Sequence, residues 1–465
     1  MASDDDIPSY ENKTIELSYF PDIHSIFETS SDPQELKYYW NAWRKKNQKW
    51  SLNNFLVMVN VIFGPRNGRT KFLHFCFSFK GITAYEFWMQ DFNMTQMDAV
   101  MMQIQPFYLQ LHGFIRHQLN KKYGDSIIST NGPIPDHLFQ QVLAQAWTNG
   151  SVLEENLTHK NLPKYNEILT KHNYDTMKLF KMANKFYESM GFEAIPESYW
   201  GTRLKMKSDE DEGDCKATIL AGSSNVYMQY CHKMDFRTFM QAHGYLAEIH
   251  VALEKPNLPA YYSDSYGMEY AIGEAVILSA STPKHLTDIG LLSDFEFTEE
   301  LLMNRLMRLS IHTMLNIPHY WELMDKYVGV GPPGDRVNNT FDFPYLGLNE
   351  NIQSRKFNSE ILSYQFYAKL CSISGKYPKD HLQKCDFYGS NEAGDALKKM
   401  IKLGSSKPIE DVLAAILPED PKLNAESLLE YYSLALNWLS VYNQKNNVNI
   451  GWIHSNRKIG SVKLP

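Results

Sequence analysis

The sequence predicts an all-α protein, and three observations support that fold class. Over residues 97–119, apolar side chains recur with helical spacing, at positions 100, 101, 104, 107, 108, 111 and 115. Residues 182–190 and 428–442 show a similar spacing. Alternating strand-like patterns are rare along the chain. Pro106 falls inside the first of these segments and is expected to kink or restart that helix.

Composition limits the classes of protein and partner. The 465 residues are 43% hydrophobic, which is enough for a large buried core in one helical body or in two or three domains. The net charge of −7, without a Lys/Arg cluster, argues against a nucleic-acid partner. No apolar run approaches the length of a transmembrane helix. The first residues lack the features of a secretory signal, so we expect an intracellular chain or a signal missing from this sequence.

Several segments are predicted to lie outside helices. Residues 132–135 (GPIP) and 330–334 (VGPPG) are expected to form loops, and the acidic tract 208–214 is expected to be a solvated surface loop. Residues 55–79 contain two β-branched and aromatic runs around a Pro/Gly turn. They predict a hairpin inside a helical protein, or alternatively a translated intron or a wrongly assigned exon.

The five cysteines are compatible with two local disulfides. Cys215 and Cys231 lie 16 residues apart, Cys371 and Cys385 lie 14 apart, and Cys76 is left over. Unrelated buried thiols remain an equally good interpretation of this spacing, and no CxxC zinc motif occurs. The chain also has Asn-x-Ser/Thr glycosylation signals, which we call sequons. These candidate sites are Asn12, Asn93, Asn149, Asn156 and Asn338.

Distinctive blocks of sequence occur along almost the whole chain. They are FETSSDPQELKYYWNAWR (27–44), QIQPFYLQLHGFIRHQLNKKYGDSIISTNGPIPDHL (103–138), AQAWTN (144–149), KFYESMGFEAIPESYW (185–200), EYAIGE (269–274), LSASTPKHL (278–286), KCDFYGSNEAG (384–394), KKMIKLGSSKPIEDVL (398–413) and LNWLSVYNQKNNVNIGW (436–452). These blocks resemble the angiotensin-converting enzyme family of zinc peptidyl-dipeptidases, and they follow the family's order. Runs such as STPKHL and KLGSSKP are too long for coincidence.

The resemblance implies a two-lobed, all-α ellipsoid with a deep central groove. We expect one truncated domain over 1–465, with 55–80 as an anomalous insertion and 453–465 as a tail. The family's amino-terminal helical lid is expected to be missing, as is a Trp-Trp segment before 326–331. Family members are secreted or membrane-tethered ectodomains, which implies an extracellular location. The resemblance also implies the disulfides Cys215–Cys231 and Cys371–Cys385.

Active members of the family bind zinc through two histidines and a glutamate, and a further glutamate acts as general base. The family's AHHEMGH motif aligns with AHGYLAE at 242–248. Gly244 therefore stands at the first histidine ligand, Tyr245 at the base and Glu248 at the second histidine ligand. The i, i+4 spacing would place both ligands on one face of a helix.

The third ligand position is altered as well. In EYAIGE (269–274), Tyr270 stands at the glutamate ligand, and Glu274 replaces the aspartate that orients a ligand. No ligand and no general base of the family is retained, so we expect the chain to carry no cofactor, with a bound chloride possible.

Other groove positions have changed too. Lys216 stands at a substrate-binding histidine and Lys356 at the tyrosine that stabilises the oxyanion. Gln145 is expected to be a remnant of the carboxylate-binding glutamine, and Arg355 a remnant of the chloride-binding arginine. The remaining substrate-contacting positions are Pro344, Leu346 and Gln353.

A relocated metal site would need new ligands. His243 and Glu248 point roughly 140° apart around a helix, and His243 and His250 are separated by about 10.5 Å along it. His250 and Glu254 have i, i+4 spacing, and we expect them to form a surface pair near the helix end.

Three functions are therefore considered. The first is a catalytically inactive, secreted scaffold that binds an unknown peptide or protein ligand. The second is a working zinc peptidyl-dipeptidase that releases C-terminal dipeptides with unusual ligands. The third is a decaying or mis-assembled gene product without a stable function.

Overall fold

The computed structural model describes residues 6–18, 22–45, 94–139, 162–206, 218–221, 226–230, 235–255, 267–291, 324–333, 350–379 and 381–453. Most of this described part is helical, which confirms the all-α class. The α-helices are α1 (His24–Thr29), an unlabelled helix at 33–45, α5 (Met94–Tyr123), α6 (Leu162–Lys171), α7 (Thr176–Ser189), α8 (Phe236–Glu254), α9 (Met268–Ala280), α10 (Pro283–Asp288), α13 (Glu350–Ile373), α14 (Asn391–Ile401), α15 (Ile409–Leu413), α16 (Glu426–Tyr431) and α17 (Ser433–Lys445). Short 3-10 turns occur at η2 (Asp136–Phe139), η3 (Glu197–Tyr199) and η7 (Leu382–Lys384), and a π turn at η6 (Met324–Val328).

Helix α5 confirms the first predicted helical segment but not a restart at Pro106. The helix runs through this proline without a break. Pro106 lies on the exposed side of α5, where water can solvate the carbonyl that loses its N–H partner. The predicted helix at 182–190 lies mostly in α7. The predicted helix at 428–442 is divided at Tyr432 into α16 and α17.

The strands are short and form three small sheets. In the largest, β6 (Val226–Tyr230) lies between β4 (Leu204–Met206), to which it is parallel, and β5 (Thr218–Ala221), to which it is antiparallel. A hairpin pairs β1 (Ile7–Pro8) with β2 (Glu16–Leu17).

The third sheet corrects two loop predictions. Strand β3 (Ile134–Pro135) pairs in parallel with β7 (Val330–Gly331), so the segments 132–135 and 330–334 meet. The N–H of Ile134 donates to the carbonyl of Gly329 at 2.7 Å. Local turn signals in each segment could not show this pairing, because the two partners are distant in sequence.

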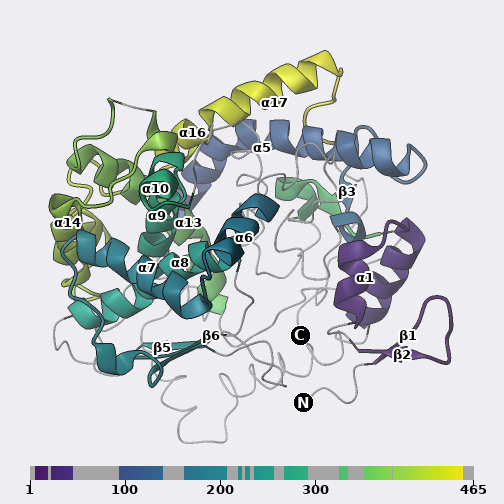
Figure 1. Cartoon of the computed structure of the whole chain (residues 1–465). Helices are drawn as coiled ribbons and strands as arrows, with labels where there is room; N and C mark the ends of the chain where they lie inside the picture. The colour runs from purple at the N-terminus through teal and green to yellow at the C-terminus, as the bar shows by residue number, and fades with distance from the viewer. Residues whose placement is uncertain are drawn as a thin grey trace, which may run out of the picture.

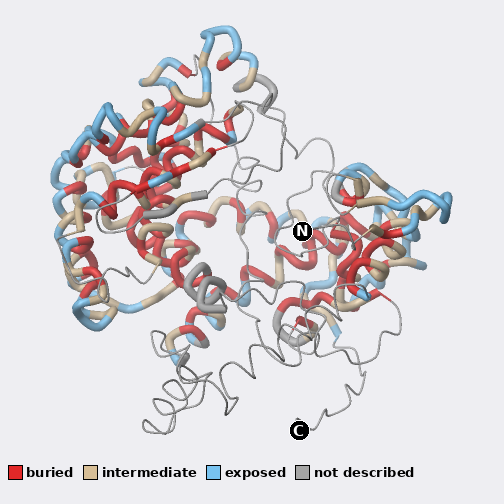
Figure 2. The backbone as a smooth tube through the Cα atoms, turned by 90° about the horizontal axis from the view of Figure 1, so that it is seen from below, coloured by how far each residue is buried: buried red, intermediate tan, exposed pale blue. Residues whose placement is uncertain are grey.

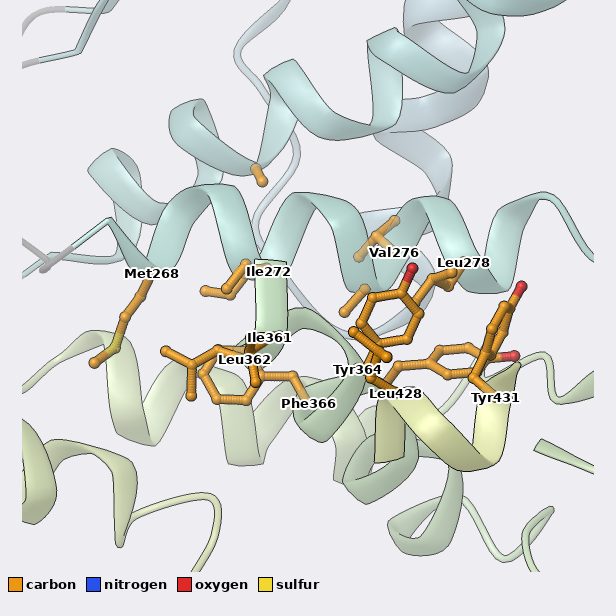
Figure 3. Packing of buried hydrophobic residues seen from close by; sticks show 14 of the residues in the cluster. Met268, Ile272, Val276, Leu278, Ile361, Leu362, Tyr364, Phe366, Leu428 and Tyr431 are labelled. Carbon is orange, nitrogen blue, oxygen red and sulfur yellow. The ribbon is translucent and has the colours of Figure 1, made fainter. Parts of the chain in front are cut away.

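Helix α9 lies at the centre of the main core. It packs against α8 on one side and α13 on the other, and α7 covers α8. Figure 3 shows apolar side chains of α9 meeting those of α13 and α16, including Ile272, Leu362 and Leu428. Ten of the thirteen α9 residues are buried, which explains why the helix is apolar nearly all the way round.

The amino-terminal helices have a separate hydrophobic core. Ile23, Phe27, Leu36 and Trp40 belong to this second cluster, which the main cluster does not include. Figure 1 shows α1 on the opposite side of the molecule from α7–α10 and α14, with α5 running between the two sides. Figure 2 shows buried residues concentrated separately on each side. The two sides agree with a two-lobed molecule, whereas the central groove remains a prediction.

Several predictions fall outside the described residues. These are the segments 55–80 and 208–214, the disulfide Cys215–Cys231 with the unpaired Cys76, the sequons at Asn93, Asn149, Asn156 and Asn338, and the tail after residue 453. In the part of the chain that is described, no helix combines the length and apolarity needed to span a membrane.

The disulfide Cys371–Cys385 is confirmed. It joins the end of α13 to the residue that follows η7, with Cα atoms 6.1 Å apart and both residues buried. Tyr367, one turn earlier on α13, donates its hydroxyl to the carbonyls of Leu382 and Cys385. The same connection is therefore held by covalent and hydrogen bonds.

Removing this disulfide should destabilise the protein measurably. The cross-link closes a loop with a sequence separation of 14, and loss of its constraint on the unfolded chain costs about 3 kcal/mol. We expect the Cys371→Ala, Cys385→Ala double variant to lose about this much free energy of unfolding in urea titrations. The wild type under reducing conditions is the matched control. A double variant as stable as the oxidised wild type would contradict the expectation.

Candidate active site

Helix α8 carries the AHGYLAE segment on which the site prediction depends. Asp235 caps the helix: its carboxylate accepts a hydrogen bond from the N–H of Thr238 at 2.7 Å. The helix continues to Glu254, just before Pro256, whose ring restricts the preceding residue to extended conformations. Residues 242–248 lie in the middle of this rigid element, and α7 and α9 pack against it.

Gly244 lies where the backbones of α8 and α9 approach each other closely. A Cβ atom added at Gly273 on α9 would lie 2.9 Å from the Gly244 carbonyl oxygen and 3.0 Å from its Cα. A Cβ added at Gly244 would lie 3.1 Å from Cδ1 of Ile277. Both glycines therefore allow the two helix backbones to come together. Position 244 supplies no side chain that could bind a metal.

Tyr245 and Glu248 lie on the same helix, and both are half-buried. The Tyr245 ring contacts Tyr230 of β6 edge-on, with ring centroids 5.8 Å apart. Burial and the nearby Glu248 carboxylate raise the pKa of the Tyr245 hydroxyl above its usual value. Burial and the neighbouring Glu269 also raise the pKa of Glu248 to about 7, so much of this carboxyl is protonated at neutral pH.

Tyr270, in the first turn of α9, connects that helix to α13. Its hydroxyl donates to Oε2 of Glu360 at 3.4 Å. Burial, the negative charges of Glu274 and Glu360, and hydrogen bonds to both carboxylates raise its pKa far above the usual value. The phenol therefore stays neutral and acts as a hydrogen-bond donor among carboxylates.

The two histidines considered for a relocated metal site are both in the core. Nδ1 of His243 lies 2.8 Å from the Phe239 carbonyl, and Nε2 of His250 lies 3.1 Å from Oδ1 of Asn184. The His250 ring also stacks on Tyr187, with centroids 4.5 Å apart. The predicted surface pair of His250 and Glu254 is thus wrong, because His250 faces α7 and is only 1% exposed. Burial lowers the pKa of both histidines to about 3.

The side chains of the other predicted groove residues are not among those that the structure describes. Gln145, Lys216, Pro344 and Leu346 lie outside the described residues. Gln353, Arg355 and Lys356 belong to the first two turns of α13, but their side chains are not among the described ones. Their assigned roles remain predictions.

Comparison with known proteins identifies the family. The family model described as angiotensin-converting enzyme, peptidase family M2, matches residues 1–319 and 318–452. The chain belongs to the angiotensin-converting enzyme family. It is 28% identical to the angiotensin-converting enzyme of Haematobia irritans exigua, over 92% of this chain and 75% of the relative. It is also 27% identical to the angiotensin-converting enzyme-related protein of Drosophila melanogaster, over 96% of this chain and 75% of the relative. The angiotensin-converting enzyme of Bos taurus is 27% identical over 98% of this chain, which covers 36% of that longer protein.

This membership corrects one expectation. The chain was expected to carry no cofactor, but it belongs to a family of zinc metallopeptidases, so zinc is the metal to test for. The described side chains do not fit that metal at the family's position. Gly244 has no donor, and the neutral Tyr270 phenol already donates to Glu360. Within the described residues, no group of three His, Cys, Asp or Glu side chains could hold a metal ion.

Sequence reasoning missed the partners that surround these positions. Glu360 is 90 residues from Tyr270 in sequence, and no spacing pattern pointed to their contact. Tyr187 of α7 donates its hydroxyl to the His243 carbonyl at 2.6 Å and lies close enough to Glu274 for that charge to raise its pKa. The site is therefore built by four helices, α7, α8, α9 and α13.

A buried polar cluster around Asp386 connects Ser279 of α9 and His285 of α10. The Asp386 carboxylate accepts hydrogen bonds from the Ser279 hydroxyl at 2.9 Å and from the Tyr388 N–H at 2.9 Å, and lies 3.3 Å from Nδ1 of His285. Burial alone would raise the pKa of Asp386, but His285 and the other donors lower it overall. The serine contacts the aspartate instead of the histidine, so this is not a nucleophilic triad. The STPKHL and KCDFYGS blocks thus meet to hold the fold.

Proposed function

We propose that this member of the angiotensin-converting enzyme family is a catalytically silent, extracellular protein that binds a peptide or protein ligand without hydrolysing it. The proposal treats residues 1–465 as a single domain. The observation that carries it is the state of the four key positions on α8 and α9. They hold a glycine, two tyrosines and a glutamate whose pKa is raised to about 7: Gly244, Tyr245, Tyr270 and Glu248.

The absent general base is the strongest argument. A residue that activates a water for attack must accept its proton near neutral pH. The Tyr245 phenol already carries a proton, and burial and Glu248 hold it there by raising its pKa. Glu248 could accept a proton when ionised, but it lies on the next turn of α8. Efficient water attack is therefore not expected even if a metal is supplied.

The alternative is a zinc-dependent peptidyl-dipeptidase that releases C-terminal dipeptides. Family membership and the surviving carboxyl group of Glu248 are the observations in its favour. The two functions differ in turnover, so an activity measurement made with zinc present separates them without assuming whether zinc binds.

The test uses protein secreted from insect cells and assayed with added zinc. We expect no release of dipeptide from an amino-blocked tripeptide above the level without protein. The Haematobia enzyme serves as the positive control, and a chelator identifies metal-dependent turnover. Chelator-sensitive release would overturn the proposal. A cooperative melting transition that rises with a bound peptide would support a folded scaffold and count against a decaying gene product.

Restoring the two histidines alone should not restore hydrolysis. The Gly244→His, Glu248→His variant regains two nitrogen donors but still lacks the base and the third ligand, so we expect dipeptide release to stay at background. The new side chain at 244 must also displace the tip of Ile277, 3.1 Å from its Cβ. The matched comparison adds Tyr245→Glu and Tyr270→Glu to the same background. Turnover by the double variant would contradict the prediction.

A further inference from the structure

The amino-terminal unit, which comprises the β1–β2 hairpin, α1 and the helix at 33–45, is a structural group of its own. These elements share one hydrophobic cluster, to which Ile7 of the hairpin and Phe27 of α1 belong. The hairpin is also hydrogen-bonded to the long helix, because the Tyr38 hydroxyl donates to the Pro8 carbonyl at 2.9 Å. No residue of this cluster belongs to the main core cluster. The described contacts within the unit are therefore separate from those that hold the main core.

The long helix of the amino-terminal unit contacts η2 through one face. Lys37, Trp40 and Arg44 follow one another at three- and four-residue spacing, which places them on the same side of the helix. The Asp136 carboxylate accepts hydrogen bonds from Nε1 of Trp40 at 2.7 Å and from Nη2 of Arg44 at 3.0 Å. The Lys37 ammonium lies near enough to His137 for its positive charge to lower the pKa of that imidazole. Two adjacent residues of η2 thus meet three side chains of the unit.

The turn η2 is part of the main body, the portion of the molecule that contains the main core. Its residues Leu138 and Phe139 belong to the main core cluster, and β3, directly before it, pairs with β7. Figure 1 shows the amino-terminal helices next to β3. Among the described residues, the two apolar clusters do not merge across this contact. The free energy that holds the unit against η2 therefore depends strongly on polar groups, whose hydrogen bonds must compensate for their removal from water.

His137 is the group at this contact whose charge changes most readily near neutral pH. Its side chain is 4% exposed, and the buried Nδ1 atom has no hydrogen-bond partner among the described residues. Burial and the positive charge of Lys37 lower the pKa of His137 to about 3, so the imidazole is neutral while the unit is docked. The other charged groups at the contact are Arg44 and Asp136, and neither β3 nor β7 contains a titratable side chain. A proton on His137 would therefore add a buried positive charge close to Lys37.

From this arrangement we infer that the amino-terminal unit undocks from η2 when the pH falls, that the main core stays folded in this step, and that protonation of His137 drives it. Undocking exposes the imidazole to water, where its pKa returns toward 6.5. Below that value the undocked form binds a proton that the docked form does not, so docking is complete above pH 6.5 and weakens as the pH falls toward 3. The ratio of undocked to docked protein should rise about 25-fold between pH 7 and pH 5.

Two indole N–H groups distinguish this step from unfolding of the main core. The N–H of Trp40 reports undocking directly, because its hydrogen bond to Asp136 breaks when the unit leaves η2. The N–H of Trp452 is the reference, since it donates to the Asp325 carbonyl at 2.6 Å within the main body. Undocking leaves the second bond in place, whereas unfolding of the main core breaks both. Hydrogen exchange at the two indoles therefore separates the two events.

The test measures deuterium exchange of both indole N–H groups by NMR at pH 7 and pH 5, in the full chain with isotopically labelled tryptophan. Dividing each rate by that of N-acetyltryptophanamide at the same pH gives an equilibrium constant for opening. We expect this constant at Trp40 to rise about 25-fold in the wild type and less than about 3-fold in His137→Gln, whose glutamine takes up no proton. His172→Gln is the matched control and should keep the wild-type rise, because His172 is exposed.

Three results would overturn the inference. The first is an opening constant at Trp40 that changes by less than about 3-fold between pH 7 and pH 5 in the wild type, and the second is an equal rise in His137→Gln. The third is an opening constant at Trp40 equal to that at Trp452 at both pH values, because the unit would then open only together with the main core. The first and third results need only the wild type, so they decide the question even if His137→Gln does not fold.

Discussion

Lowering the pH from 7 to 5 is expected to reduce the free energy of unfolding by several kcal/mol. Burial lowers the pKa of four described histidines from 6.5 to about 3, so the folded protein keeps them neutral. They are His112, His137, His243 and His250. The unfolded chain takes up a proton at each as the pH falls below 6.5, and the folded chain does not. Stability is therefore complete above 6.5 and declines as the pH falls toward 3.

The expected size follows from the linkage between protonation and unfolding. One pKa unit is worth about 1.4 kcal/mol, so each histidine contributes a loss of about 2 kcal/mol between pH 7 and 5. Glu248 has the opposite sign, because its folded pKa is raised to about 7 and its contribution is present at low pH and lost as the pH rises through 7. This contribution offsets about 2 kcal/mol of the stability that the histidines lose between pH 7 and 5. The net loss of about 6 kcal/mol is comparable with the whole stability of many proteins.

Urea unfolding at pH 7, 6 and 5 measures this effect directly. The glutamine in His250→Gln cannot take up a proton. The fall in the free energy of unfolding between pH 7 and 5 should therefore be about 2 kcal/mol smaller in this variant than in the wild type. His172→Gln is the matched control, since His172 is exposed and its replacement should leave the pH dependence unchanged. A wild-type stability that is constant within about 1 kcal/mol over this range would contradict the burial of neutral histidines.

Replacing Asp136 by asparagine should cost about 3–5 kcal/mol of stability, because it removes the negative charge that contacts the buried guanidinium of Arg44. The Asp136 carboxylate is fully buried. It accepts hydrogen bonds from Nε1 of Trp40 at 2.7 Å and from Nη2 of Arg44 at 3.0 Å. The guanidinium of Arg44 also lies 4.2 Å from the Trp40 ring centroid. This pair connects the amino-terminal helices to η2, whose Leu138 belongs to the main core.

The comparison that isolates the charge is the double variant Arg44→Met, Asp136→Asn. The asparagine oxygen can still accept from Trp40, and the guanidinium is gone, so the double variant should be more stable than Asp136→Asn alone. Asp125→Asn is the control: this exposed carboxylate accepts from Nδ2 of Asn120 at 2.7 Å, and its loss should matter by less than about 0.5 kcal/mol. Equal effects at positions 136 and 125 in thermal or urea unfolding would contradict the assigned role of the buried pair.

Much of the fold was predictable because local sequence patterns indicate where the helices lie. Helical spacing located most of α5 and α7, and the family resemblance ordered the blocks along the chain. It also raised Cys371–Cys385 above the alternative of unrelated thiols. The predictions that failed were local too: GPIP and VGPPG contain turn residues, but each supplies a strand that pairs with the other. Similarly, the i, i+4 spacing of His250 and Glu254 could not show that His250 faces Tyr187.

The sequence alone determined the family and the identities of the residues at the key positions, because residue order is preserved in the blocks whatever their packing. Gly244, Tyr245, Glu248 and Tyr270 could be named without coordinates. Only the tertiary structure decided their environment: which carboxylate accepts from Tyr270, why Glu248 holds its proton, and how closely Gly244 and Gly273 approach. Those properties depend on burial and on charges contributed by four separate helices. Residues distant in sequence set them, so no local pattern encodes them.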